Sequence, residues 1–576
     1  MLEILRSGRA TFLLLLAFAA CQAYGKGSLH ESLDYRLERV SKGDHFEYSV
    51  LLSFDGLNSG ETTLELPADW AGTRDAYKRV VRVEATASDV QVKWDGTRQV
   101  RIAYPPNKTK VELRYVFGPS SDLPTAANRA YYLPILTDPY IHLIGWTTWA
   151  VPRPLSDDLA ISIDLSRLPT EWKLAAGSKM ESRTIKYRGP ISGFQSGQLV
   201  AGDFRVYSRA VRGGAVTVAI RGEWPFADSS AVERIAMIVD GERSFWKDDG
   251  QGDLLVTVLP LAQETTQTIV GVALAKSFAS FANAQTDLNK FDYLFTHESF
   301  HAWNARAFGL LGEPGASLFW FIEGFTDYYT HLLRLRWGYL TLEGFLEQFD
   351  VALRGLGTSE YSKIGNQGVA DQFFTNSAIG RIPYWRGTLL AAKWDNEIKR
   401  RSGGKSSLDD AMRRILSEQK AGTTHFERNV VSRVMKEFGV DDPSSDIDRF
   451  IVQGENIVLP EEALSQCSVI ESVQYHPFDL GFNYSEARRS GAISGVAPGS
   501  NAYLAGVRDG MLLRGASFTS GNPTREATLE VETEGVRSRI AYKPISQHSR
   551  SGQSVHLRPG LDSGIALACA RWFGVQ

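Results

Sequence analysis

The sequence predicts a multidomain α+β protein, in which β-rich parts precede and follow a largely helical middle. A chain of 576 residues exceeds the size of one compact core, so several domains are expected. Apolar residues make up 43% and charged residues 22% of the chain, as in ordinary globular proteins, which argues against disorder. The formal net charge of -3 provides no field that would attract nucleic acid or an anionic membrane.

The first residues have the build of a secretory signal peptide. Arg6 and Arg9 precede an apolar run from Phe12 to Ala20, which small residues follow. This run is too short to cross a bilayer, and no later stretch of the sequence is long and apolar enough, so no membrane span is expected. We assign residues 1–23 to the signal peptide and expect a periplasmic or secreted protein. The alternative is a lipoprotein with an N-terminal lipid anchor at Cys21.

Residues 24–210 are expected to form an antiparallel β-domain. Segments such as HFEYSVLLSF and KVELRYVF are rich in β-branched and aromatic residues and are bounded by turn-forming residues. Nothing in this stretch concentrates titratable groups, so we interpret it as a scaffold. Residues 211–460 are expected to form a second, mainly helical domain, because apolar residues recur at helical spacing from residue 288. Short strands and glycine-rich turns return in residues 465–576 and predict a third domain.

A candidate metal site lies in the helical stretch. In HESFH, His297 and His301 fall on one face of the expected helix, where both imidazoles can bind one Zn²⁺. Glu323 opens a second expected helix, which can return its carboxylate to the same ion as an antiparallel neighbour. Two imidazoles, one carboxylate and an open fourth position are typical of a catalytic zinc site. We therefore predict one Zn²⁺ per chain.

Two carboxylates accompany these three ligands. Glu298 lies beside the metal without being a ligand, and this position suits a general base. Asp327 follows Glu323 by four residues on the same helical face, where it can accept the outer N–H of a liganding imidazole. We assign it to His297 by analogy with thermolysin-like enzymes.

The segments HESFHAWN, WFIEGFTDYY and YWRGTLLAAKWDNEIKRRSGGKSSLDDAM together resemble the glycyl aminopeptidase family, a branch of the gluzincin metallopeptidases related to aminopeptidase N. The resemblance implies a thermolysin-like catalytic domain between an N-terminal β-domain and a C-terminal PDZ-like domain. It further implies peptide substrates, with His297, His301 and Glu323 as zinc ligands and Glu298 as the base.

One tyrosine is the candidate donor to the oxyanion that forms in such a reaction. Tyr384 in PYWRG matches the tyrosine of the family's Tyr-x-Lys-Gly motif, with Arg386 in place of the lysine. Tyr328 and Tyr329 are rival donors, and a Tyr384 that only packs is the other alternative.

The sequence departs from the family upstream of the zinc helix. Family members commonly carry Gly-Gly-Leu-Glu-His there, and its glutamate invites comparison with the amine-binding residue of aminopeptidase N. The corresponding segment here, VGVALAKSFASF, contains no carboxylate. A buried ammonium without an anionic partner is costly, so exopeptidase and endopeptidase action both stay open. Aminopeptidase action on short peptides is the expected form.

The last part of the chain supports a second hypothesis. DLGF at 479–482 and SGVAPGSNAYLAGVRDGMLL at 494–513 look like a PDZ domain, which binds the C-terminus of an extended peptide. The stretch after Gly510 lacks the usual Asp-x-Ile, so a remnant without a ligand is the alternative. The protein could thus be a catalytically silent, zinc-stapled peptide-binding module, although the intact Glu298 favours a peptidase. Cys467 and Cys569 could form a disulfide, but the sequence does not show whether their Cα atoms meet.

Overall fold

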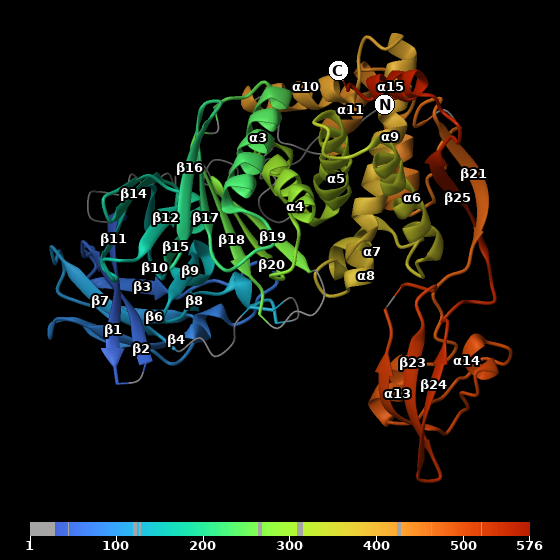
Figure 1. Cartoon of the computed structure of the whole chain (residues 1–576). Coiled ribbons are helices and arrows are strands. Elements are labelled where there is room, and N and C mark those ends of the chain that lie inside the picture. Colours follow the sequence, from blue (N-terminus) through green and yellow to red (C-terminus); the bar gives the residue numbers. More distant parts are fainter. Residues whose placement is uncertain are drawn as a thin grey trace, which may run out of the picture. The chain divides into compact units, whose positions relative to one another are not determined.

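The computed structural model describes residues 29–43, 45–118, 124–125, 128–250, 252–262, 268–307, 315–422, 428–461, 463–519 and 521–575. The expected signal peptide and Cys21 lie outside the described residues. The chain forms two compact units (Figure 1). Of the described residues, the first unit contains those up to 209, those of 215–225 and those of 252–286, and the second contains those of 210–214, those of 226–251 and those from 287 onward.

The first unit is β-rich, as the sequence predicts. Its largest sheet has seven strands in the order β13-β14-β11-β1-β2-β7-β4. Along β1 (His30–Lys42), Leu33, Tyr35 and Leu37 are buried in alternation, because successive side chains of a strand point to opposite faces. The other strands of this sheet are β2 (His45–Phe54), β4 (Val80–Ala85), β7 (Val111–Phe117), β11 (Leu155–Arg167), β13 (Met180–Glu181) and β14 (Thr184–Gly189).

This sheet is antiparallel except at one pair. β1 runs parallel to β11, because the long connection between them allows the chain to return in the same direction. Two four-stranded sheets, in the orders β10-β3-β6-β5 and β12-β15-β9-β8, complete the β-rich part. Their strands and two short helices are β3 (Glu61–Glu65), β5 (Gln91–Lys93), β6 (Gln99–Ala103), β8 (Ile135–Leu136), β9 (Tyr140–Ile144), α1 (Gly145–Thr148), β10 (Val151–Arg153), β12 (Lys173–Ala176), α2 (Ile191–Gln195) and β15 (Gln198–Gly202).

A five-stranded mixed sheet has the order β16-β17-β18-β20-β19. Its two inner pairs, β17 with β18 and β18 with β20, are parallel, and β19 closes the edge in antiparallel fashion. The segment VGVALAKSFASF, which the sequence analysis singled out, forms β19, the following turn and most of β20. The strands are β16 (Arg205–Val211), β17 (Gly214–Ile220), β18 (Leu254–Pro260), β19 (Ile269–Leu274) and β20 (Ser277–Ala282).

The second unit is built on helices around an aromatic core. Trp320, Phe325 and Trp394 pack with ring centroids about 6 Å apart and are almost fully buried. The helices are α3 (Asp228–Trp246), α4 (Leu288–Phe300), α5 (Phe319–Arg336), α6 (Leu342–Thr358), α7 (Asn366–Gln372), α8 (Ser377–Gly380), α9 (Ile382–Ser402), α10 (Leu408–Lys420), α11 (Arg428–Glu437) and α12 (Pro443–Asp446). None of the helices in the described ranges combines the length and apolar character needed to cross a membrane.

The C-terminal segment divides between this core and a small sheet. β21 (Ser468–Tyr475) and β25 (Arg550–Leu557) pair in antiparallel fashion and lie against α6, where Ser554 donates a 2.7 Å hydrogen bond to Asp350. Cys467 and Cys569 form a disulfide, with Cα atoms 6.0 Å apart. A separate three-stranded sheet packs with two short helices; these elements are α13 (Tyr484–Ser490), α14 (Asn501–Leu504), β22 (Leu512–Ser517), β23 (Ala527–Thr533) and β24 (Val536–Tyr542). The last helix, α15 (Ser563–Trp572), follows β25.

Candidate metal centre

Helix α4 carries the HESFH segment at its C-terminal end. The helix begins after Asp287, whose carboxylate accepts a 3.1 Å hydrogen bond from the backbone N–H of Lys290. Phe291 and Phe295 are buried and stack on each other, with ring centroids 5.3 Å apart. His301 is the C-cap, but its backbone keeps a helical conformation, so its side chain stays on the face that carries His297. A π-helical segment, Ala302–Ala307, follows.

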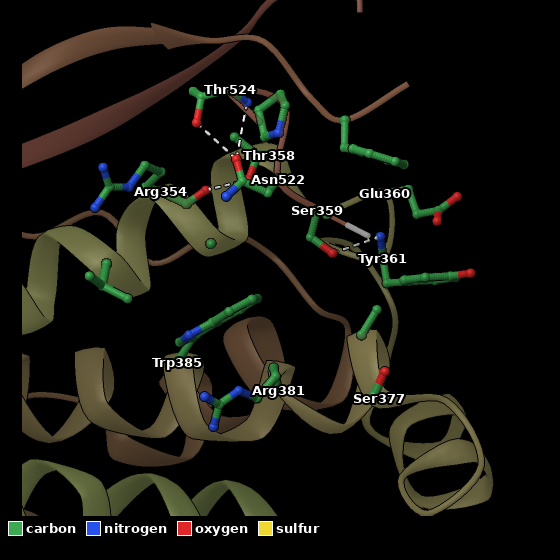
Figure 2. A pocket seen from close by; sticks show the side chains of 16 residues that line it. Arg354, Thr358, Ser359, Glu360, Tyr361, Ser377, Arg381, Trp385, Asn522 and Thr524 are labelled. Atoms are coloured by element: carbon green, nitrogen blue, oxygen red, sulfur yellow. Dashed lines mark hydrogen bonds between the residues drawn. The ribbon is translucent and has the colours of Figure 1, made fainter. Parts of the chain in front are cut away.

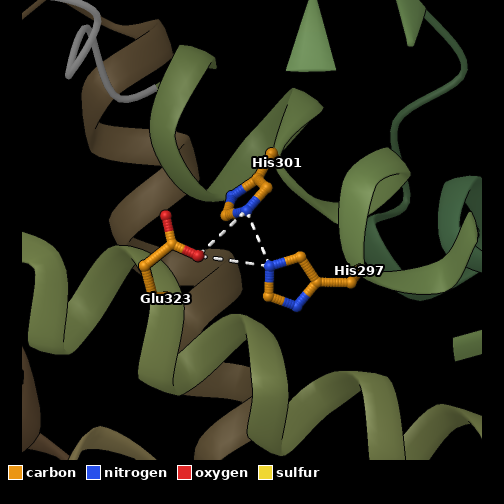
Figure 3. Close-up of side chains that lie close together, drawn as sticks. All are labelled: His297, His301 and Glu323. Carbon is orange, nitrogen blue, oxygen red and sulfur yellow. Dashed lines mark hydrogen bonds and ion pairs between the residues drawn. The ribbon is translucent and has the colours of Figure 1, made fainter. Parts of the chain in front are cut away.

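Two imidazoles and one carboxylate point toward one another from α4 and α5 (Figure 3). His297 Nε2 lies 3.1 Å from His301 Nε2 and 3.2 Å from Glu323 Oε2, and the distance from His301 Nε2 to Glu323 Oε2 is 3.5 Å. Tetrahedral zinc with bonds of about 2.0–2.1 Å keeps its ligand atoms about 3.3 Å apart. The three donors therefore fit three corners of a zinc tetrahedron and leave the fourth open. In the part of the chain that the structure describes, no other group of three such side chains is a candidate metal site.

The outer nitrogen of His297 faces Asp327. Its Nδ1 lies 3.2 Å from Asp327 Oδ1, which also accepts a 2.5 Å hydrogen bond from the hydroxyl of Tyr293. Burial alone would lower the pKa of His297, but Asp327 and Glu323 raise it to about 10. The site thus attracts positive charge to the His297 ring, and a metal cation can take the place of the proton. Sequence reasoning missed Tyr293, which lies one helical turn before His297.

The outer nitrogen of His301 faces the backbone carbonyl of Asn304 at 3.4 Å. The Asn304 side-chain amide donates to the carbonyl of Phe321 at 3.1 Å and to Thr326 Oγ1 at 3.0 Å, so it ties the π-helical segment to α5. Asn304 therefore positions both His301 and the helix that carries Glu323. Sequence reasoning missed this role, although Asn304 is the last residue of the segment HESFHAWN, which carries the family resemblance.

Helices α5 and α9 approach each other at two glycines. A Cβ atom added to Gly387 would lie 1.9 Å from the carbonyl oxygen of Trp320, and one added to Gly324 would lie 2.4 Å from the Cα of Gly387. Only glycine allows so close an approach of two backbones. The close contact of the two helices places the first turn of α9, which contains Tyr384, beside the metal centre. The Tyr384 ring stacks on the His297 ring, with the ring centroids 5.9 Å apart.

Tyr384 is the one of the three candidate tyrosines that lies beside the ligands. Burial and the nearby charge of Glu323 raise its pKa well above the usual value, so it stays a neutral O–H donor. The hydroxyl of Tyr328 instead donates to Asp395 at 2.8 Å, and the ring of Tyr329 stacks on Phe300 in the core.

Arg386, which replaces the family lysine, does not face the ligands. It is 2% exposed and donates to the backbone carbonyls of Ile364 at 2.7 Å and Ser362 at 3.0 Å. Burial lowers its pKa to about 10. Arg386 therefore ties the start of α9 to the segment that contains Ser362 and Ile364.

Glu298 occupies the position between the two histidines of α4. It is half-buried, whereas both of its neighbours, His297 and Ser299, are buried. Because adjacent helical residues point about 100° apart, the Glu298 side chain leaves α4 on a more accessible side of the helix, next to the side that carries His297.

Residues 290–371 match the model of the family described as M61 glycyl aminopeptidase. The matched stretch includes the three metal-centre residues, Glu298 and Asp327. The match over this stretch, together with a donor set that suits zinc, indicates a zinc metallopeptidase.

A solved structure shares the fold of this chain at low sequence identity. An aminopeptidase N family protein from Idiomarina loihiensis is 16% identical, with a TM-score of 0.71, over 94% of this chain and 100% of that protein. An M1 zinc metallopeptidase from Deinococcus radiodurans is 15% identical over 76% of this chain and 97% of that protein, with a TM-score of only 0.46. None of the curated proteins matches the chain.

Proposed function

We propose that the protein is an exported zinc aminopeptidase. It cleaves short peptides at a metal centre formed by His297, His301 and Glu323. The observation that carries the proposal is the spacing of 3.1–3.5 Å among the three donor atoms, next to a half-buried glutamate. A structural zinc site has four protein ligands, whereas three ligands and an adjacent base suit hydrolysis. The aminopeptidase form is supported by the description of the matched family.

Each residue of the centre has a separate task in this proposal. Zinc held by the three donors would polarise the substrate carbonyl and acidify the attacking water. Glu298 takes the proton from that water and returns it to the leaving amine. The hydroxyl of Tyr384 donates to the oxyanion. Asp327 and Asn304 hold the two imidazoles in their ligating orientation.

The test compares the zinc-loaded protein with its Glu298→Gln variant on short unblocked peptides. We expect chelator-sensitive cleavage by the wild type and a loss of about 10²–10⁴-fold in kcat for the variant, with one zinc per chain in both. Glu347→Gln, at an exposed glutamate on α6, is the matched control and should keep full activity. Equal inertness of wild type and Glu298→Gln at full zinc occupancy would support the silent, zinc-stapled module instead.

The aminopeptidase part of the proposal has its own test. Rates on a peptide and on its N-acetylated form distinguish the two modes, because only exopeptidase action needs the free amine. We expect the acetylated peptide to be cleaved at least tenfold more slowly. Equal cleavage of both forms would make the enzyme an endopeptidase and leave the zinc chemistry intact.

Export is proposed from residues 1–23, and lipidation at Cys21 is its alternative. The intact mass of the protein recovered from cell fractions separates the two. Removal of the first residues without added mass supports a soluble exported protein, and added acyl mass at a new N-terminal cysteine supports the anchor.

The expected peptide ligand of the PDZ-like segment is a further part of the proposal. In the DLGF turn, the N–H of Gly481 already donates to the carboxylate of Asp479 at 2.7 Å. An incoming peptide carboxylate must displace this group, so we expect weak binding. Titration of a fluorescent C-terminal peptide library, compared between wild type and Asp479→Asn, measures it; tighter binding by the variant is the expected result.

A further inference from the structure

A pocket of about 760 Å³ lies between the C-terminal end of α6 and the N-terminal end of α9 (Figure 2). Thr358, Ser359 and Tyr361 line it from the end of α6, and Arg381 and Trp385 line it from the start of α9. The turn at 521–524 contributes a further wall. Tyr384, the proposed oxyanion donor, follows Arg381 by three residues, so one helical turn joins the pocket to the metal centre.

Arg381 carries a charge without a carboxylate partner among the described residues. Its guanidinium carbon lies 5.6 Å from the centre of the Tyr384 ring, and its side chain is exposed. The two other charged side chains that line the pocket, Arg354 and Glu360, do not offer an unpaired positive charge. Arg354 pairs with Asp350 at 3.4 Å, and Glu360 lies at the opposite end of the pocket from Arg381 in Figure 2. Arg381 is therefore the positive group available to an anion that enters beside Tyr384.

We propose that this pocket receives the part of the substrate that follows the scissile bond, and that Arg381 pairs with its free C-terminal carboxylate. The inference rests on the proposed peptidase function and names its substrate class: short peptides with an unblocked C-terminus. A guanidinium suits this task, because its planar fork binds both oxygens of a carboxylate.

The geometry also sets the length of the preferred substrate. The centre of the Tyr384 ring lies 5.9 Å from that of His297 and 5.6 Å from the Arg381 guanidinium, so the His297 ring and this guanidinium are at most about 12 Å apart. An extended peptide advances about 3.3–3.6 Å per residue. At most three residues beyond the scissile bond are therefore needed to bring a terminal carboxylate to Arg381, which for an aminopeptidase means peptides of up to four residues.

The test measures kcat and KM for a tripeptide and for its C-terminal amide with the zinc-loaded full chain. For the wild type we expect a KM about tenfold lower for the acid than for the amide. Arg381→Ala should abolish this difference by raising KM for the acid, and Arg381→Lys should restore part of it. Arg414→Ala, at an exposed arginine of α10 that pairs with Glu418, is the matched control and should keep the wild-type preference.

Calorimetric binding of the same two peptides to the zinc-loaded Glu298→Gln protein separates the two proposals, because it needs no turnover. Tighter binding of the acid, lost in the Glu298→Gln, Arg381→Ala double variant, supports the pocket even if the wild type cleaves nothing. Cleavage of acid and amide with equal KM, or an Arg381→Ala enzyme that still prefers the acid, overturns this inference and leaves the peptidase standing.

Discussion

Replacing Gly387 by alanine tests whether the contact between α5 and α9 assembles the proposed catalytic groups. The new Cβ would lie 1.9 Å from the carbonyl oxygen of Trp320, whereas ordinary contacts begin at 3.4 Å. The helices must therefore separate by about 1.5 Å, since the opposing atom is backbone and cannot rotate away. Overpacking of this kind costs about 1–3 kcal/mol of stability. The same shift moves Tyr384 away from Glu323, and a displacement of about 1 Å can cost about 100-fold in rate.

The assay combines kcat/KM on a short peptide with the melting temperature of the zinc-loaded protein. Gly387→Ala should lose about 100-fold in kcat/KM and melt several degrees lower. Gly368→Ala on α7 is the matched control, because its Cβ would meet only the flexible end of Ile364. An alanine at 387 that leaves both quantities unchanged would refute the view that this glycine contact positions the site.

Three other predictions concern single side chains. Tyr384→Phe should lower kcat about 10²–10³-fold with little change in KM, measured by steady-state kinetics; a loss confined to KM would contradict its role as oxyanion donor. Asp327→Asn should weaken zinc affinity about 10–100-fold in a competition titration with a chelator, and unchanged affinity would remove Asp327 as the partner of His297. His142, buried against Phe281 in the first unit, has its pKa lowered by burial to about 3. It resists protonation in the folded state, so its contribution to stability is present above pH 6.5 and is lost as pH falls toward 3. Denaturant unfolding should show a loss from pH 7 to pH 4 that is about 3 kcal/mol smaller in His142→Leu than in the wild type; equal losses would contradict this.

The metal centre could be predicted from the sequence because its information is local. Helical spacing places His297 and His301 on one face, and the structure brings both to Glu323. The same four-residue spacing predicts that Asp327 lies on the face of α5 that carries Glu323. The roles of Tyr293 and Asn304 could not be predicted, because each depends on which neighbouring helix its side chain meets.

The choice among the three tyrosines also needed the structure. Tyr328 and Tyr329 follow Glu323 within two helical turns, whereas Tyr384 lies on another helix far along the sequence. Only the crossing of α5 and α9 shows which of the three tyrosines lies beside the ligands. Gly324 and Gly387 permit that crossing, but a glycine within a helical pattern does not reveal its partner.

The organisation of strands was predicted less completely than the helices. The β-rich character of the first unit follows from residue patterns, but the parallel pairing of β1 with β11 joins segments more than 100 residues apart. In the C-terminal segment the pattern indicates strands without showing that β25 returns to lie against α6. Such long-range pairing depends on the whole chain, whereas turns and alternation are local.

Anomalous X-ray scattering at the zinc edge, from crystals of the full chain grown with zinc, tests the central claim most directly. We predict one peak per chain, bonded at about 2.0–2.2 Å by His297 Nε2, His301 Nε2 and a Glu323 oxygen, with Glu298 nearby but not bonded. A peak at other residues, or a Glu323 carboxylate turned away from an ion held by the two histidines, would contradict the account.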